Sequence, residues 1–285
     1  MFYQLDCLPC LFGLALRAAR AATDDEEIQR QVLNSIAESI ARFPPDLKPP
    51  ELSQRGFRLI TEISQNDDPF IKEKAESNRQ ALKAYPLMKR LVEKAEDQFF
   101  TACKLAIVGN SFDLGMDFEH GGMDKVLEDA ISYSLTINDY DKFKSALMKC
   151  ESLLYLGDNA GEIVFDRLLI EEIAKFSDGH IHFAVRGKPV INDATMEDAL
   201  SVGMDKVATV ISNGSDAPGT ILPECSDEFM EVYQAADVII AKGQGNYESL
   251  EGEPGNIFFF LRAKCPIVAE LIGVNVGDFI LKQGG

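Results

Sequence analysis

The amino-acid sequence predicts an α/β protein, in which an all-helical N-terminal domain precedes a three-layer α/β/α domain with a mostly parallel sheet. Two patterns support this fold class. Apolar residues recur at helical spacing through the first hundred residues, and from residue 151 short apolar runs alternate with glycine-containing turns and helical stretches. Such alternation is typical of βα units. We therefore expect a helical domain over residues 1–100 and an α/β domain over residues 101–285.

The helical pattern is clearest in residues 24–43. From Ile28 onward a branched apolar residue recurs every four positions, acidic residues crowd the first turn, and Pro44 follows the last turn. A further helix is expected to begin after Pro86 and to carry a single apolar stripe toward Gly109.

Short apolar runs in the second part of the chain are the expected strands. Their hydrophobicity is nearly continuous, which suits strands covered by helices on both faces. Parallel strands end at the same edge of a sheet, so we expect the turns that follow them to converge there. The runs are SLLYLG (152–157), HIHFAVRG (180–187), KVATVISNG (206–214), DVIIAKG (237–243), NIFFFL (256–261) and VGDFIL (276–281).

Composition excludes several classes of partner. The 285 residues include 46 acidic and 28 basic ones, for a formal net charge of −18, so there is no basic footprint for nucleic acid or an anionic membrane. No uncharged stretch approaches the roughly 18 to 20 residues of a membrane span. Six cysteines in a chain of this length do not form a dense disulfide framework, and we expect a cytoplasmic location. Composition does not indicate an oligomeric state.

The turns after the first two expected strands contain candidate metal ligands. Asp158 and Asn159 follow the first strand, and Asp193 lies in the turn after the second. These side chains supply only oxygen donors, which suit Mg²⁺ or Mn²⁺ and leave further positions for water and a substrate phosphate. A purely structural alternative for Asp193 is that it caps the helix after it.

Cations and small residues in the same turns complete a phosphate-binding arrangement. Arg186, Lys188 and Lys242 could face the oxygens of a phosphoryl group. Glu162 and Gly214 belong to the same set of turns and are further candidates for substrate binding. These residues indicate a metal-dependent phosphatase acting on small phosphorylated metabolites, with Asp158, Asn159 and Asp193 as its catalytic and metal-binding residues.

Other interpretations of these turns stay open. GDNAGE is close to the glycine-rich turn of an adenosylmethionine-dependent methyltransferase, although Asn159 replaces the second glycine and the next strand ends in Arg186, not in an acid. A protein that only binds a divalent metal, without turnover, is a second alternative. Because Asp158 is not part of a D-x-D motif, we expect water activated by the metal as nucleophile, with a phosphorylated Asp158 as the alternative.

Two further pairs of residues are assigned structural roles. His180 and His182 are spaced like a zinc pair, yet they start a strand, and we expect a buried or edge pair. Cys7 and Cys10 could form a redox pair or half of a zinc site, but a lone C-x-x-C cannot complete a tetrahedral site, so we expect packing.

Several segments together resemble one known family. GDNAGEIVFD, AVRGKPVINDAT, SNGSDAPGT and AKGQGNYE, with DCLPC near the N-terminus and an internal GNSFD, occur in the order found in the metal-dependent damage-control phosphatases, relatives of acidic residue methyltransferase-like proteins. The resemblance spans nearly the whole chain. The C-x-x-C pair is similar to the stand-alone microbial branch, and the Arg-Thr-x-Lys motif of the eukaryotic branch is missing.

The resemblance implies a helical N-terminal region packed on an α/β/α metal-binding catalytic domain. It implies a divalent metal, Mn²⁺ or Mg²⁺ with Ni²⁺ or Co²⁺ as substitutes, held by the Asp-Asn pair and the later Asp. It also implies hydrolysis of phosphate monoesters of metabolites, notably sugar phosphates and damaged or surplus cofactor intermediates. By the same likeness Asn110 and Asp113 of GNSFD lie near the substrate, as do Lys242 and Asn246.

Overall fold

A mostly parallel sheet forms the centre of the larger part of the protein. The computed structural model describes residues 1–109, 127 and 131–284, and within them the sheet has seven strands in the order β1-β7-β6-β5-β2-β3-β4. Neighbouring strands are parallel except β6 and β7. The strands are β1 (Ile137–Asn138), β2 (Ser152–Leu156), β3 (His180–Val185), β4 (Thr209–Ser212), β5 (Val238–Lys242), β6 (Ile257–Arg262) and β7 (Phe279–Gln283).

The six apolar runs identified in the sequence coincide with β2 to β7, so the expected α/β class with a mostly parallel sheet is confirmed. Successive residues of each strand contribute to different cores. In β2, Leu153 and Tyr155 pack on one face of the sheet, whereas Leu154 and Leu156 pack on the other. Both faces are apolar because both are covered by helices.

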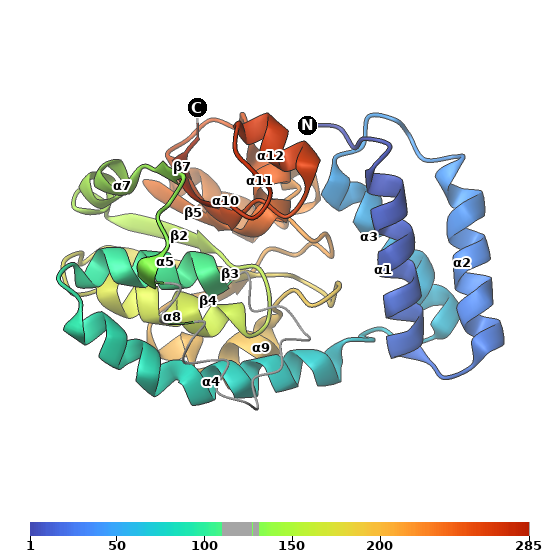
Figure 1. The fold of residues 1–285 in the computed structure, drawn as a ribbon, viewed down its shortest axis with the longest axis horizontal. Helices are drawn as coiled ribbons and strands as arrows, with labels where there is room; N and C mark the ends of the chain where they lie inside the picture. Colours follow the sequence, from blue (N-terminus) through green and yellow to red (C-terminus); the bar gives the residue numbers. More distant parts are fainter. Residues whose placement is uncertain (110–126, 128–130, 285) are drawn as a thin grey trace.

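Helices cover the sheet on two sides (Figure 1). On one side, α5 and α8 pack against the sheet and α4 packs against α8. On the other side, α10, α11 and α12 supply the apolar partners. The bounds are α4 (Ile71–Lys94), α5 (Gln98–Gly109), α7 (Tyr140–Leu147), α8 (Glu162–Ile173), α9 (Met196–Ser201), α10 (Asp227–Ala235), α11 (Gly243–Leu250) and α12 (Pro266–Ile272), with short 3₁₀ turns at Met204–Lys206 and Leu222–Glu224.

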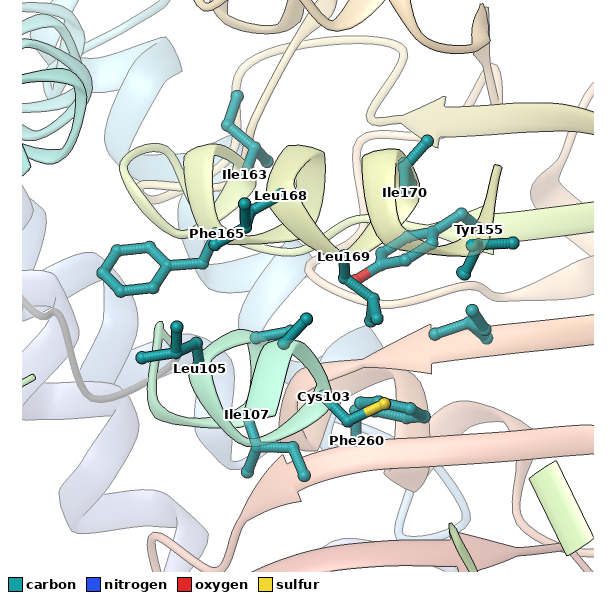
Figure 2. Packing of buried hydrophobic residues seen from close by; sticks show 14 of the residues in the cluster. Cys103, Leu105, Ile107, Tyr155, Ile163, Phe165, Leu168, Leu169, Ile170 and Phe260 are labelled. Atoms are coloured by element: carbon teal, nitrogen blue, oxygen red, sulfur yellow. The ribbon is translucent and has the colours of Figure 1, made fainter. Parts of the chain in front are cut away.

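Helix α5 lies deep in the protein. Figure 2 shows Cys103 and Leu105 of this helix beneath the apolar side chains of α8, with Phe260 of β6 beside them. The two helices approach so closely that a β-carbon on Gly109 would lie 3.0 Å from the ring of Phe165. The close packing of α5 on α8 therefore fixes the positions of the two helices that contact Lys242, at the carboxyl end of β5.

The first three helices form a separate cluster beside the sheet (Figure 1). They are α1 (Cys7–Ala22), α2 (Glu26–Ile40) and α3 (Pro49–Ser64). Their core includes Leu11, Ile36 and Phe57, and Val190, from the segment after β3, joins it. The proposed domain boundary at residue 100 stays a prediction. None of the helices in the described segments combines the length and apolarity that a bilayer crossing requires.

The expectation that a helix begins after Pro86 is wrong. Pro86 lies inside α4, which runs without interruption to Lys94, and a separate helix, α5, begins at Gln98. The break occurs at Asp97, whose carboxylate accepts a hydrogen bond from the backbone of Phe100 at 2.9 Å, as a helix N-cap does. Packing of α4 against α8 offsets the one backbone hydrogen bond that a proline removes.

We expect Pro86→Ala to raise the free energy of unfolding by about 1–3 kcal/mol, because an exposed alanine would restore the missing hydrogen bond and remove the ring clash. Urea unfolding of the variant and the wild type measures the difference. Lys83→Ala, at another exposed position of α4, is the control and should change stability by less than about 0.5 kcal/mol. An unchanged or lower stability of Pro86→Ala would show that the proline is accommodated in α4 without strain.

Candidate active site

The polar turns meet where the order of the sheet changes direction. Strand β2 lies between β3 and β5, so the chain proceeds from β2 toward β4 on one side and from β5 toward β6 on the other. In an open α/β sheet this arrangement leaves a crevice beyond the carboxyl ends of the two central strands. Asp158 follows β2 there, Arg186 follows β3, and Lys242 ends β5.

Two loops pair with each other and bring the predicted metal ligands together. The backbone N–H of Ala160 donates to Asn192 O at 2.9 Å, and the N–H of Ala194 donates to Asp158 O at 2.8 Å. These bonds flank a bridge between Asn159 and Asp193. The first two strand ends therefore form one rigid unit, and their side chains occupy one site.

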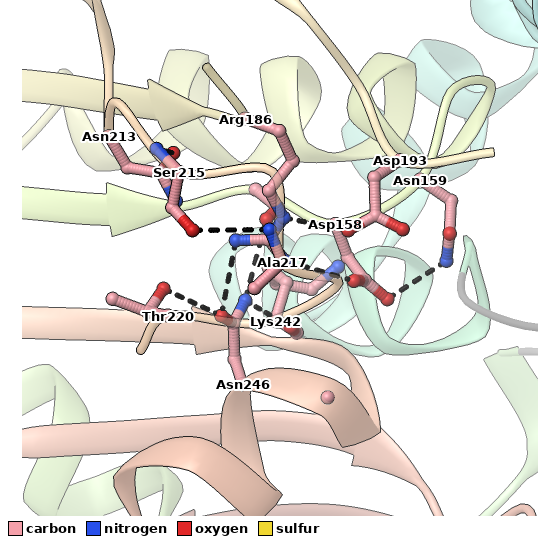
Figure 3. Close-up of polar contacts among 12 residues, drawn as sticks. Asp158, Asn159, Arg186, Asp193, Asn213, Ser215, Ala217, Thr220, Lys242 and Asn246 are labelled. Carbon is pink, nitrogen blue, oxygen red and sulfur yellow. Dashed lines mark hydrogen bonds and ion pairs between the residues drawn. The ribbon is translucent and has the colours of Figure 1, made fainter. Parts of the chain in front are cut away.

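Arg186 contacts both aspartates (Figure 3). Its Nε donates to Asp193 Oδ2 at 2.7 Å, and its Nη2 is 3.5 Å from Asp158 Oδ1. Its Nη1 donates a long bond of 3.5 Å to Asn246 Oδ1. Within the described part of the chain, the buried Nη2 has no hydrogen-bond partner. One guanidinium group thus contacts residues that follow three different strands.

Both aspartates are buried in a setting that disfavours their charge. Burial raises the pKa of Asp158 well above its usual range, and the nearby Asp193 and Glu162 raise it further. Burial also raises the pKa of Asp193, while Arg186 opposes that rise. The site therefore holds more acidic groups than its arginine can neutralise, which favours either protons or a bound cation.

Asn159 is oriented by acidic neighbours. Its Nδ2 donates to Asp158 Oδ2 at 2.8 Å and to Glu162 Oε2 at 3.2 Å. The nitrogen of Asn159 is held in this way, and its amide oxygen is the type of donor that suits ligation of a hard cation.

Lys242 forms hydrogen bonds with the acidic residues of α8, behind the site. Its ammonium group is fully buried and donates to Glu162 Oε1 at 2.5 Å, Asp166 Oδ1 at 2.7 Å and Ala106 O at 2.7 Å. These three bonds use all three of its N–H donors. Direct contact between Lys242 and a phosphoryl group stays a prediction, and in this structure Lys242 acts on the site through Glu162.

Gly243 lets the backbone approach Asp158. It has a positive φ of 77°, and a β-carbon there would lie 1.9 Å from Asp158 Oδ2. No other residue type fits in that space, so the start of α11 packs directly against the carboxylate.

The remaining sequence-predicted residues differ in their positions. Asn246 is fully buried, and besides its contact with Arg186 its Oδ1 accepts a hydrogen bond from Thr220 at 2.8 Å. Lys188 and Gly214 are exposed and line a neighbouring cavity. Asn110 and Asp113 lie outside the described residues.

Asp193 does not cap a helix. Thr195 is the N-cap of α9, and its side chain and that of Asp198 form a reciprocal capping box. The side chain of Asp193 is instead directed to Arg186. The sequence leaves two roles open for Asp193, metal ligand and helix cap. The structure assigns the cap to Thr195, two residues later.

Sequence reasoning missed several residues near the site. Asp166 follows Glu162 by four positions, which places both on one face of α8, and this spacing was the available signal. Asn78 of α4 accepts a hydrogen bond from Gly161 N at 2.7 Å. The charge of Lys264, after β6, lowers the pKa of Asp158 and that of Asp193. Neither Asn78 nor Lys264 has a signal in the sequence, because both come from elements outside the identified motifs.

The histidine pair lies away from this cluster, whereas the cysteine pair lies near Cys265 and near Glu248 of α11, whose charges add to the effect of burial in raising the pKa of both thiols. His180 and His182 sit at the start of β3, with ring centroids 4.4 Å apart, whereas the site is beyond the end of that strand. Cys7 and Cys10 are in the first turn of α1 and form no disulfide. The described residues contain no group of three or more His, Cys, Asp or Glu side chains arranged to hold a metal ion.

Comparison with known proteins places the chain among phosphatases. The family model of the damage-control phosphatase ARMT1-like domain matches residues 3–280. A damage-control phosphatase of Pyrococcus horikoshii is 37% identical over 282 residues, which cover 98% of this chain and 97% of that protein. A damage-control phosphatase of Archaeoglobus fulgidus is 38% identical over 286 residues, with 97% of each chain covered. The crystal structure of a DUF89 family protein from Pyrococcus horikoshii matches with a TM-score of 0.93 and 36% identity over 100% of both chains.

The fold, the polar cluster at its switch point and these relatives define the protein as a phosphatase and therefore as an enzyme. More particularly, the chain belongs to the damage-control phosphatase ARMT1-like family. The family inferred from the sequence motifs is thus confirmed. The relatives' names support neither the methyltransferase nor the non-enzymatic alternative.

Replacing Lys242 tests its buried ion pairs with Glu162 and Asp166. Lys242→Met should lower the free energy of unfolding by about 3–5 kcal/mol, because Glu162 and Asp166 would lose their buried cation. The loss should be smaller at pH 6 than at pH 8. In the wild type, burial raises the pKa of Asp166 to about 7 although Lys242 lowers it. Without the lysine this pKa should be higher, so between pH 6 and pH 8 the folded variant keeps a proton that the folded wild type releases, and its stability falls more steeply as the pH rises.

Urea unfolding at the two pH values measures this effect. Lys142→Met is the matched control, since Lys142 is exposed and pairs with the partly exposed Asp139, and it should cost no more than about 1 kcal/mol at either pH. A loss from Lys242→Met that is as small as that of the control would show that the buried charges do not depend on the lysine.

Proposed function

We propose that this phosphatase is metal-dependent and hydrolyses phosphate monoesters of small metabolites, with sugar phosphates or phosphorylated cofactor intermediates as candidate substrates. One observation carries the proposal: two buried aspartates and an asparagine amide share a site with an arginine whose Nη2 is 3.5 Å from Asp158 but makes no hydrogen bond among the described residues. A buried donor of this kind is costly unless a ligand pairs with it. An oxygen of a phosphoryl group is a suitable partner.

The donor set fits a hard divalent cation. Asp158, Asn159 and Asp193 offer carboxylate and amide oxygens, which suit Mn²⁺ or Mg²⁺. The pKa of both aspartates is raised by burial first and by neighbouring acids second, and a cation would offset both effects. When bound, the ion would supply charge stabilisation at the phosphoryl oxygens and activate the attacking water.

The chain's own residues would position the phosphoryl group. Arg186 is held by Asp193 through Nε, and its Nη2, which lies 3.5 Å from Asp158 Oδ1 without a hydrogen bond among the described residues, could donate to a phosphoryl oxygen. Lys264, which is exposed, adds a positive charge that favours the ionised form of both aspartates. Glu162 accepts a hydrogen bond from the amide of Asn159, so Glu162 would position Asn159 and would not contact the substrate. A cytoplasmic location is part of the proposal and is supported by six cysteines that form no disulfide.

Turnover of an aryl phosphate should require added divalent metal. Exhaustive chelation should abolish the activity, and Mn²⁺ or Mg²⁺ should restore it, because oxygen-only sites bind these ions reversibly. Circular dichroism before and after chelation would confirm that the fold is retained. Full activity after exhaustive chelation would contradict metal dependence.

Asp193→Asn should reduce turnover by about 100-fold or more and raise the metal concentration needed for half-maximal activity, because the carboxylate charge is lost. Stability should change little, since the asparagine oxygen can still accept from Arg186. Turnover against metal concentration, with thermal unfolding alongside, measures both effects. The control is Asp205→Asn, an exposed aspartate distant from the motifs, which should leave both properties unchanged. Wild-type turnover and metal dependence in a folded Asp193→Asn protein would remove this residue from the site.

A further inference from the structure

A cavity of about 370 Å³ lies between helix α3 and the loops that follow β3 and β4. None of the described residues that line it has an apolar side chain. Its lining residues are Arg58, Lys188, Gly214, Ser215, Asp216 and Glu224. Arg58 comes from the N-terminal helical cluster, so the cavity is formed jointly by the two parts of the chain.

The cavity adjoins the active site through the backbone. Lys188 is two residues after Arg186, and their α-carbons can be no more than about 7 Å apart. Between them, the N–H of Gly187 donates to Ser215 O at 2.8 Å and to Asn213 Oδ1 at 3.1 Å. The two loops are thus tied together beside the arginine that contacts Asp158 and Asp193.

Arg58 is held in place by charge-assisted hydrogen bonds. Its Nε donates to Asp216 Oδ2 at 2.7 Å and its Nη2 to Asp216 Oδ1 at 2.5 Å, a bidentate pair. The buried Gln54, one turn earlier on α3, donates to Asp216 at 2.7 Å and to Glu224 at 2.5 Å. This bonding fixes α3 against the loop after β4, so the wall of the cavity is preorganised.

The lining is balanced in charge and rich in hydrogen-bonding groups. Arg58 and Lys188 offset Asp216 and Glu224. Within the described residues, Lys188 has no hydrogen-bond or ion-pair partner. A hydroxyl group both donates and accepts, so a ligand with several hydroxyls can bond to cations and carboxylates together. A flat apolar ring would desolvate the same groups without pairing them.

We propose that this cavity binds the leaving group of the phosphate monoester and that α3, through Arg58, makes the enzyme selective for hydroxyl-rich alcohols over apolar ones. The inference rests on the proposed phosphatase function and deepens it, because it assigns substrate selection to the N-terminal helices. Arg58 is a specificity-determining residue in this arrangement, and the phosphoryl group itself is held by the residues around Arg186.

The experiment compares kcat/KM of the metal-loaded enzyme for a hexose phosphate and for para-nitrophenyl phosphate. In Arg58→Ala, the ratio of the two values, hexose phosphate over aryl phosphate, should fall about 10-fold, with the change mainly in KM for the hexose phosphate. Arg55→Ala is the matched control, since Arg55 is an exposed arginine of the same helix that does not line the cavity, and it should leave the ratio unchanged.

Arg58→Lys covers the case in which Arg58→Ala does not fold. It keeps the charge but loses the bidentate geometry, and the ratio should fall about 3-fold. Thermal unfolding of each variant separates selectivity from stability. An equal change of kcat/KM for both substrates in folded variants would overturn this inference while leaving the proposed function intact. Absence of turnover of either ester by the metal-loaded wild type would overturn the proposed function and this inference with it.

Discussion

The buried ammonium group of Lys242 is the interaction on which the active site depends most. It joins the end of β5 to Glu162 and Asp166 of α8 and to the last part of α5 through Ala106 O. A lysine is buried in this way only when its charge is paired, because removing an isolated ammonium from water costs several kcal/mol. The three acceptors supply that pairing. The same contact therefore fixes the position of two helices relative to the centre of the sheet.

A series of hydrogen bonds links Lys242 to the predicted metal ligands. Glu162, held by the lysine, accepts a hydrogen bond from Asn159, and Asn159 donates in turn to Asp158. Asp158 then lies against Gly243, directly after Lys242 in sequence, where only a glycine leaves room for the carboxylate. The chain of contacts closes on itself, so each side chain at the surface of the site is positioned by one that is more deeply buried.

Much of the fold was readable from the sequence because each strand is a short apolar run followed by a polar turn. That pattern located β2 to β7 and also indicated that Asp158 and Asp193 would meet, since both follow parallel strands. Which face a side chain takes was harder to predict, because strands covered on both sides lack an alternating pattern. Lys242 follows Ile240 by two positions and shares its face, toward α5 and α8, not toward the solvent. The cavity at Arg58 was not predictable, because it depends on contacts between α3 and a loop more than 150 residues away.

The sum of the formal charges of its buried groups explains why a cation suits this site. Among its buried side chains, four are acidic, Asp158, Glu162, Asp166 and Asp193, and two are cationic, Arg186 and Lys242. Four negative charges and two positive ones leave a formal charge of −2 when every group is ionised. Buried charge without a partner is unfavourable, and the raised pKa of Asp158, Asp166 and Asp193 is the expected response, because protons then replace the missing positive charge. A divalent ion would neutralise the same excess without protonating the ligands. On the proposal that an ion binds here, its binding would release protons from these carboxylates.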